Sequence, residues 1–243
     1  MDAPQLHRSD SAEELADLVA GTLVRTLADV QRQGRVPSVA LTGGTIADAI
    51  HRTLAQSPDA ALVDWSRVDV WFGDERFVPA DDPDRNARQA AEAMLDRLPF
   101  DPARIHPMPA SDAAYADVAD AATAYGDELR THGGGSFDVV MLSLGPDGHV
   151  ASLFPGAPQL DVQDAVAVPV TDSPKPPPER VSLTVAALNH SREVWFLVSG
   201  AGKAEAAARA LSGDADPHDA PAVGVRGQER THWFLDEDAA AQL

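Results

Sequence analysis

Short apolar runs that end in a glycine-rich or polar turn and then lead into a helical pattern recur along this chain. Four such runs predict strands at 38–41, 68–72, 137–142 and 193–198, and the turns that follow them are 42–45, 73–76, 145–149 and 199–203. Strands that alternate with helices in this way favour right-handed crossovers and a parallel sheet. We therefore expect an α/β fold with a Rossmann-like, doubly wound, mainly parallel sheet and helices on both of its faces.

The remaining segments extend the same pattern. Ser11 and Glu14 have capping-box spacing and predict the start of a helix that stops at Gly34. Further helices are expected at 86–98, 111–129 and 202–211, and further strands at 165–170 and 231–235. Successive prolines make 171–179 an irregular, rigid loop. The length fits a single α/β domain over residues 1–243, in which 99–135 is a candidate for a small subsidiary lobe.

Charge and composition narrow the classes of partner. The formal net charge of -19 argues against a nucleic-acid or anionic-membrane surface, because such partners attract basic faces. The sequence contains no cysteine, which excludes disulfides and thiolate chemistry. The first residues lack the apolar core of a signal peptide, and no later apolar run is long enough to cross a bilayer. We expect a cytoplasmic protein whose partner is a small molecule.

The four turns should lie together, because the carboxyl ends of parallel strands share the edge of the sheet that holds the ligand crevice. Thr42-Gly-Gly-Thr45 suits an anion cradle, since glycine lets backbone N–H groups approach and the following helix N-terminus attracts negative charge. For Gly43-Gly44 taken alone, a simple tight strand-to-helix turn is the commoner explanation. Lys203 favours the anion site, because it opens another helix at this edge. Lys203 and Lys175 are the only lysines of the sequence.

Two turns carry candidate catalytic groups. His149 suits a general base near neutral pH, and Asp147 could orient its ring. Asp74 and Glu75 could position a polar ligand, while Arg76 could hold a phosphate with two donors. The alternative interpretations are a structural histidine and a salt-bridged surface turn.

Several common chemistries are disfavoured by the residues present. Leu197 and Ala204 break a Walker A loop, and Glu205 occupies the place of the third glycine of a dinucleotide-binding loop. No Gly-x-Ser-x-Gly elbow and no His-Glu-x-x-His pattern occurs, which disfavours an ordinary serine hydrolase and a catalytic metal.

Five segments, in this order, resemble the 6-phosphogluconolactonase family. They are residues 41–45, 71–79 with Asn86, 145–156, 173–178 with Arg180, and 199–203. In the related glucosamine-6-phosphate deaminases the Asp-Gly-His loop continues toward Phe-Asn-Glu-Pro, whereas here it continues as Ser152-Leu-Phe-Pro155, which is similar to the lactonases. Two positions depart from the family pattern. Ser143 stands where glycine is common, and Thr45-Ile46 replaces a Ser-Thr-Pro ending.

The resemblance implies hydrolysis of 6-phospho-D-glucono-1,5-lactone to 6-phosphogluconate in the oxidative pentose phosphate pathway, without a cofactor or a metal. His149 would activate water, Asp74 would orient sugar or water, and backbone donors near the 145–149 turn would stabilise the oxyanion. The expected phosphate and substrate contacts are Gly43, Gly44, Thr45, Arg76, Arg180 and Lys203, and the expected loop-shaping residues are Gly145, Asp147 and Gly148. A monomer or a weak homodimer is expected.

Two alternatives remain open from the sequence. An amino-sugar-phosphate isomerase-deaminase would release ammonia from glucosamine 6-phosphate. An inert sugar-phosphate sensor on the same sheet would bind its ligand without turnover.

Overall fold

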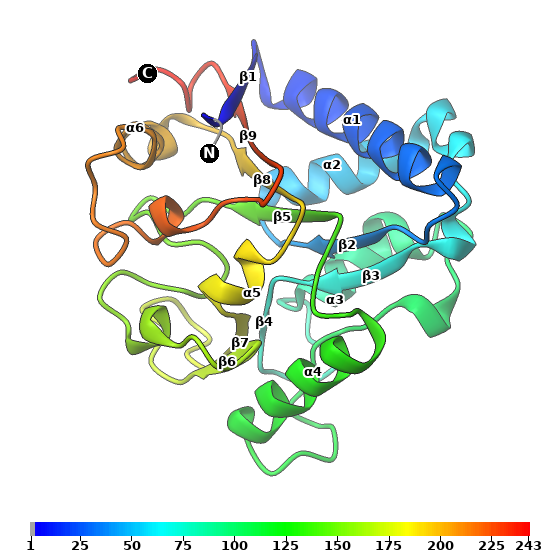
Figure 1. Ribbon diagram of the computed structural model, residues 1–243, viewed down its shortest axis with the longest axis vertical. Coiled ribbons are helices and arrows are strands. Elements are labelled where there is room, and N and C mark those ends of the chain that lie inside the picture. Colours follow the sequence, from blue (N-terminus) through cyan, green and yellow to red (C-terminus); the bar gives the residue numbers. More distant parts are fainter. Residues whose placement is uncertain (1–2) are drawn as a thin grey trace.

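The computed structural model describes residues 3–243, and its main feature is a six-stranded sheet in which every neighbouring pair is parallel. Its strands are β1 (Gln5–Ser9), β2 (Ser38–Leu41), β3 (Asp69–Phe72), β5 (Val139–Ser143), β8 (Glu193–Val198) and β9 (Arg230–Asp236). Their order across the sheet is β1-β9-β8-β5-β2-β3. The predicted α/β fold with a mainly parallel sheet is confirmed (Figure 1).

The chain moves from β2 outward to β3 in one direction and later from β5 through β8 and β9 in the other. The order therefore reverses between β2 and β5, which lie side by side in the sheet. A doubly wound sheet opens a crevice at such a reversal, outside the carboxyl ends of its strands. The turns after β2 and β5 should border that crevice.

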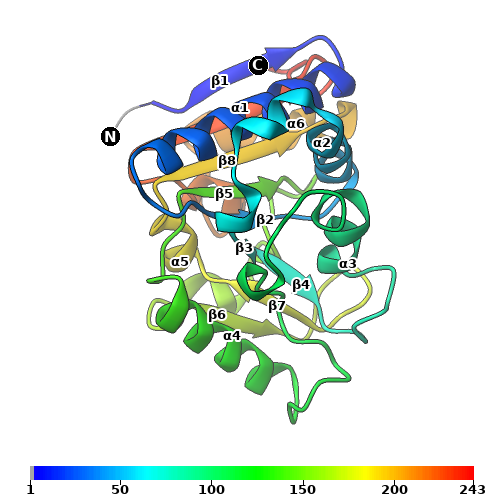
Figure 2. The same ribbon diagram turned by 90° about the vertical axis from the view of Figure 1, so that its right-hand side faces the viewer.

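Helices cover both faces of the sheet. They are α1 (Ala12–Arg32), α2 (Thr45–Gln56), α3 (Asn86–Ala90), α4 (Val118–His132), α5 (Val185–Asn189) and α6 (Ala204–Leu211). Helices α1 and α2 pack together above the sheet in Figure 2, and α4 and α5 lie below it. None of the helices described within residues 3–243 combines the length and the apolar character that a bilayer span requires.

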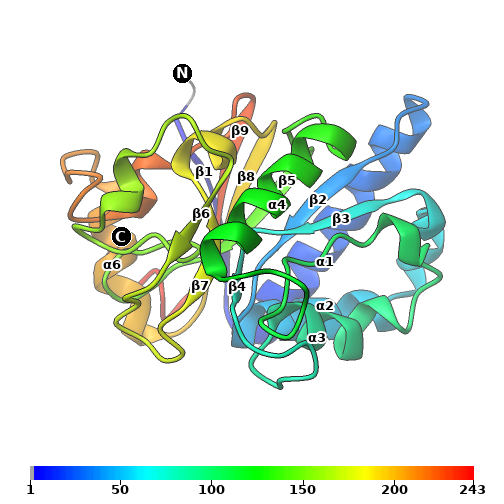
Figure 3. The ribbon, with the colours of Figure 1, turned by 90° about the horizontal axis from the view of Figure 1, so that it is seen from below.

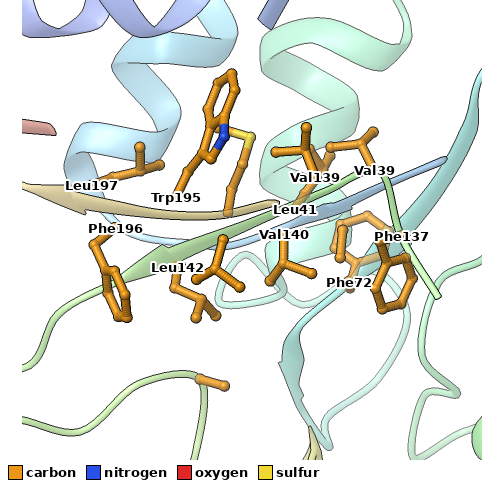
Figure 4. Close-up of a cluster of buried hydrophobic side chains, with 14 of the residues drawn as sticks. Val39, Leu41, Phe72, Phe137, Val139, Val140, Leu142, Trp195, Phe196 and Leu197 are labelled. Carbon is orange, nitrogen blue, oxygen red and sulfur yellow. The ribbon is translucent and has the colours of Figure 1, made fainter. Parts of the chain in front are cut away.

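The buried strands explain why both faces need cover. In Figure 4 the side chains of Trp195 and Leu197 point to one face of the sheet and that of Phe196 points to the other, as expected for consecutive residues of a strand. All three are at most 1% exposed. A parallel sheet that is apolar on both faces must be sandwiched between other elements.

A second, three-stranded sheet lies on the α4 side of the main sheet (Figure 3). It consists of β4 (Asp74–Arg76), β7 (Arg180–Leu183) and β6 (Ala167–Val170), and both pairings are antiparallel. The predicted strand 165–170 thus belongs to this sheet. Helix α4 packs on β6 and β7, so the part of 99–135 that was expected as a subsidiary lobe joins strands from elsewhere in the sequence.

Two helix predictions were wrong in their bounds. Asp117, not Ser111, caps α4, since its side chain accepts hydrogen bonds from the N–H groups of Ala119 and Asp120. The Ser111 N–H donates instead to the Val78 carbonyl, which ties this segment to a distant loop. The helix expected at 86–98 is α-helical only to Ala90 and continues as a π-turn over Ala91–Leu95.

The outer side of the edge strand β3 is satisfied by groups from elsewhere in the chain. The hydroxyl of Tyr125 in α4 accepts from the Phe72 N–H at 2.9 Å and donates to the Phe72 carbonyl at 3.1 Å. The His106 N–H donates to the Val70 carbonyl at 2.8 Å. The Phe72 N–H, the Phe72 carbonyl and the Val70 carbonyl, which point away from β2, therefore all have hydrogen-bond partners.

Candidate active site

The four predicted turns surround one cavity of about 240 Å³ at the carboxyl edge of the main sheet. The residues that line it are Thr42, Gly43, Gly44, Asp74, Arg76, Asn86, Ser143, Leu144, Gly145, His149, Ala151, Lys175, Pro176, Arg180 and Lys203. The cavity lies at the reversal between β2 and β5. The predicted convergence of the turns is confirmed.

The 145–149 turn is built around the His149 ring. Gly145 is required there, because a Cβ atom on it would lie 1.9 Å from His149 Nδ1. Gly148 has a φ of +87°, which L side chains rarely adopt, and a Cβ on it would press on Ala220. Arg209 of α6 holds the turn from behind by donating to the Asp147 carbonyl at 2.7 Å. The two glycines thus place His149 in the cavity wall.

The Asp147 carboxylate fixes the orientation of His149. The His149 Nδ1 and Asp147 Oδ1 lie 2.5 Å apart, so a proton on Nδ1 is donated to the carboxylate and Nε2 is left with a lone pair. Burial lowers the pKa of His149 from its ordinary value, although the charge of Asp147 and this hydrogen bond partly oppose the shift. Burial raises the pKa of Asp147, but the charge of His149 and the hydrogen bonds outweigh it and lower that pKa. The arrangement keeps the imidazole neutral and basic at neutral pH.

The backbone donors of this turn face inward. The Gly145 N–H donates to the His149 carbonyl, the Gly148 N–H to the Gly145 carbonyl, and the His149 N–H to the Asp147 carboxylate. Residue 146 is proline and has no N–H. Three of the donors within 145–149 are thus engaged in the turn, and stabilisation of an oxyanion by backbone donors near this turn stays a prediction.

The 42–45 turn leads directly into α2. Gly44 has a φ of +105° and precedes the helix without a side-chain cap, so the first N–H groups of α2 are open to a ligand. Gly43 leaves room for Asn86, because a Cβ on it would lie 1.9 Å from Asn86 Oδ1. The Ser143 hydroxyl donates to the Gly43 carbonyl at 2.8 Å and fixes the turn. Serine at this unusual position is accommodated as a hydrogen-bond donor.

Thr45 lies next to the main cavity. It lines an adjoining cavity of about 400 Å³, and Gly44, Ser143 and Lys203 line both. The predicted residues Gly43, Gly44 and Thr45 thus lie around the N-terminus of α2, with Lys203 beside them.

Arg76 and Lys203 enter the cavity from different strand ends. Arg76 donates to the Asp84 carbonyl and to the Asn86 side chain, which hold its guanidinium in place. Lys203 follows β8 in a short 3-10 turn. Burial lowers the pKa of Lys203 and the charge of Lys175 lowers it further, which indicates that cations gather here. A phosphate would relieve this mutual repulsion.

Asp74 and Arg180 share one buried network. The Ser152 hydroxyl donates to Asp74 Oδ2 at 2.6 Å, and Arg180 Nη1 lies 3.5 Å from the same hydroxyl. The other Arg180 donors bind the carbonyls of Lys175, Pro176 and Pro177. Arg180 lines the cavity, as predicted, but most of its hydrogen bonds hold the proline-rich loop.

Sequence reasoning missed two residues of this site. Lys175 lines the cavity from the proline-rich loop, and Asn86 bridges Asp74 and Arg76. Asn86 already stood beside the 71–79 motif, and Lys175 is one of only two lysines. Glu75 turns away from the cavity, since its buried carboxylate accepts from the backbone N–H groups of residues 76, 86 and 87. It holds the start of α3.

The cavity is lined by few groups suited to a metal. Within residues 3–243, no group of three or more His, Cys, Asp or Glu side chains has an arrangement that could hold a metal ion. The charged groups of the cavity are mainly cations, which suit an anionic ligand.

Comparisons with known proteins agree on one family. The sequence model described as glucosamine-6-phosphate isomerases/6-phosphogluconolactonase matches residues 10–233. A 6-phosphogluconolactonase of Streptomyces coelicolor is 48% identical over 250 residues, covering 100% of this chain and 95% of that protein. The solved structure of 6-phosphogluconolactonase from Trypanosoma brucei is similar with a TM-score of 0.84, at 28% identity, and covers 100% of both chains.

The same fold also occurs in a monomeric glucosamine-6-phosphate deaminase, with a TM-score of 0.82 at 18% identity over 98% of this chain and 100% of that one. The fold is thus shared by both branches, whereas the high sequence identities are with the lactonases. This chain belongs to the glucosamine-6-phosphate isomerase/6-phosphogluconolactonase family, in its hydrolase branch, the 6-phosphogluconolactonases.

Proposed function

We propose that this chain hydrolyses 6-phospho-D-glucono-1,5-lactone to 6-phosphogluconate, the lactone-opening step of the oxidative pentose phosphate pathway, by histidine-assisted attack of water. The observation that carries the proposal is the pairing of a partly buried histidine with a carboxylate in a cation-lined cavity. His149 Nδ1 lies 2.5 Å from Asp147, and the same cavity contains Arg76, Lys175 and Lys203.

His149 is the proposed general base. Its Nε2 takes a proton from water as the water oxygen attacks the lactone carbonyl carbon, and Asp147 stabilises the imidazolium that forms. The same Nε2 then gives the proton to the ring oxygen as the ester bond breaks. The products are a hydroxyl and a carboxylic acid, which ionises. Asp74, held by Ser152 and Asn86, orients the sugar or the water.

The phosphate is proposed to bind at the N-terminus of α2. Gly43, Gly44 and Thr45 provide backbone donors and the helix dipole there. Arg76 and Lys203 add positive charge from two other strand ends. This arrangement explains how a chain with a net charge of -19 can bind an anionic substrate. Four cations line the binding cavity, namely Arg76, Lys175, Arg180 and Lys203, and distant carboxylates are screened beyond about 10 Å.

The decisive test is lactone turnover. Freshly prepared 6-phosphogluconolactone is mixed with the protein, and acid release is followed with a pH indicator above the spontaneous rate. We expect a large enzymatic rate. A rate equal to the background would reject the proposed function.

The two alternatives have their own assays. Ammonia release from glucosamine 6-phosphate would support the deaminase. Binding of sugar phosphates by calorimetry without turnover of either substrate would support the sensor. We expect neither result, because Ser152 to Pro155 and the curated relatives both agree with the lactonases.

A further inference from the structure

The proposed reaction develops negative charge at two separate places in the substrate. The phosphate is charged throughout, and the carbonyl oxygen becomes an oxyanion when water attacks and a carboxylate oxygen in the product. Donors aimed at such a developing charge commonly contribute the largest single part of a rate enhancement. Three of the four backbone N–H groups of 145–149, those of Gly145, Gly148 and His149, are already bonded within the turn beside the proposed base. A charged donor from another element would stabilise the oxyanion more strongly than a backbone N–H.

Lys175 is a candidate to contact the lactone carbonyl oxygen. It lines the main cavity together with His149 and Pro176, whereas Lys203 also lines the adjoining cavity at Thr45 and Ile46. Lys203 thus extends to the adjoining cavity at the start of α2, whereas Lys175 lines only the main cavity. Lys175 is also close enough to His149 for its charge to lower the pKa of that imidazole.

The backbone of Lys175 is held by several hydrogen bonds. The Lys175 N–H donates to the Ser173 hydroxyl at 3.2 Å, and that hydroxyl donates to the Lys175 carbonyl at 2.8 Å. Arg180 Nη2 donates to the carbonyls of Lys175 and Pro176, and its Nε donates to that of Pro177. Consecutive prolines further restrict this loop. A lysine on a loop held in this way loses little backbone entropy when it contacts a ligand.

Arg180 itself is committed to this support. Its side chain is buried, with the residue 5% exposed, and three of its hydrogen bonds go to loop carbonyls. Its remaining Nη1 contact is to Ser152, which also donates to Asp74. One guanidinium thereby connects the loop of Lys175 to the carboxylate proposed to orient the sugar or the water.

Resting on the proposed function, we propose that the Lys175 ammonium contacts the lactone carbonyl oxygen, stabilises the oxyanion and then binds the product carboxylate, and that Arg180 is the positioning residue that holds Lys175. The phosphate stays with the N-terminus of α2, Arg76 and Lys203. When water attacks, the carbonyl π electrons move to the oxygen beside Lys175 Nζ. When they return, the bond to the ring oxygen breaks and His149 protonates that oxygen.

The experiment compares two ligands that differ only at the carbon atom that corresponds to the lactone carbonyl. The product 6-phosphogluconate carries a phosphate and a carboxylate, and glucitol 6-phosphate carries the same phosphate with a hydroxymethyl group instead. Dissociation constants are measured by calorimetry for wild type, Lys175→Met and Lys203→Met. We expect Lys175→Met to raise the dissociation constant of 6-phosphogluconate at least about tenfold and to leave that of glucitol 6-phosphate unchanged. Lys203→Met should weaken both. The kcat of Lys175→Met should fall about a hundredfold.

Arg180→Lys tests the positioning role with the charge retained. A lysine cannot reach three carbonyls in one plane, so kcat should fall while the affinity for glucitol 6-phosphate stays at the wild-type value. A purely structural defect would weaken the binding of 6-phosphogluconate and of glucitol 6-phosphate together.

The inference is overturned if Lys175→Met weakens both ligands equally, which would make Lys175 a phosphate contact, or if it weakens neither. Its failure is distinct from failure of the proposed function, in which the wild-type protein itself shows no lactone turnover.

Discussion

At the amino edge of the main sheet three arginines are paired with carboxylates, whereas at the carboxyl edge four cations line an open cavity. Asp138, which precedes β5, pairs with Arg35 and Arg192, and Glu193 pairs with Arg230. By contrast, within residues 3–243 none of Arg76, Lys175, Arg180 and Lys203 forms an ion pair. Paired arginines thus stabilise the fold at the amino edge, whereas the cations at the carboxyl edge are available to bind an anionic ligand.

This comparison makes a general point about acidic proteins. Some carboxylates of this acidic chain neutralise arginines at the amino edge and along exposed helices, and the excess of carboxylates over cations gives the net charge of -19. The carboxylates in or beside the cavity have other contacts, since Asp74 binds Ser152 and Asp147 binds His149. Net charge alone therefore says little about which ligand a local site can bind.

The largest expected effect comes from the catalytic base. His149→Asn should lower kcat for the lactone by about 10² to 10⁴-fold, because asparagine cannot accept the proton from water. The melting temperature should change little. His218→Asn, at an exposed histidine paired with Asp161, is the matched control and should retain full kcat. A His149→Asn variant with wild-type kcat would remove the histidine from the mechanism.

Removal of a carboxyl-edge cation should act on substrate affinity. Lys203→Met is expected to raise KM by about 10 to 100-fold with a smaller change in kcat, since a charged hydrogen bond to phosphate is lost. Steady-state kinetics on fresh lactone measure both parameters. Arg226→Met, at an exposed position, serves as the control. An unchanged KM in Lys203→Met would place the phosphate elsewhere.

Removal of an amino-edge charge should act on stability and not on turnover. Asp138→Asn weakens contacts to Arg35, Arg192 and the Ser38 N–H. The two arginines are partly exposed, so the loss of unfolding free energy should be about 1–2 kcal/mol. Urea denaturation measures it, and kcat/KM at low temperature should stay at the wild-type value. Loss of catalysis in the folded variant would break the distinction between the two edges.

The smallest expected effect is a shift of the pH profile. Burial holds the pKa of His149 below its ordinary value of 6.5, so kcat/KM should fall only as the pH drops below that value and the base becomes protonated. Asp147 raises this pKa by its charge and its hydrogen bond. In Asp147→Asn the acid limb should therefore move to still lower pH. A shift to higher pH would show that Asp147 does not stabilise the imidazolium.

The main sheet could be predicted because its strands carry local signals. Each is a short apolar run followed by a turn, and parallel pairing brings the turns to one edge whatever their separation in sequence. That logic was sufficient to bring His149, Lys203, Arg76 and Gly43 to one cavity. The N-terminal strand β1 was missed, because Gln5–Ser9 is mostly polar and exposed.

The smaller sheet could not be predicted as a sheet, because only its strand β6, expected at 165–170, has a local signal. Asp74–Arg76 consists of three charged residues and reads as a surface turn. Its strand character depends on pairing with Arg180–Leu183, more than a hundred residues later. The position of Lys175 depends in turn on the contacts of Arg180 with loop carbonyls. The helix cap was misplaced for the same kind of reason, since the Ser111 N–H is engaged by a distant loop.

The hydrogen bonds between Tyr125 and Phe72 have a consequence for the behaviour of the protein at high concentration. An unpaired edge strand offers its backbone groups to any passing strand, and such pairing begins aggregation. The Tyr125 hydroxyl occupies both groups of Phe72, and the His106 N–H occupies the Val70 carbonyl. A foreign strand would have to displace a buried tyrosine before it could extend the sheet at β3. One phenol group of α4 thus protects this border of the sheet against self-association.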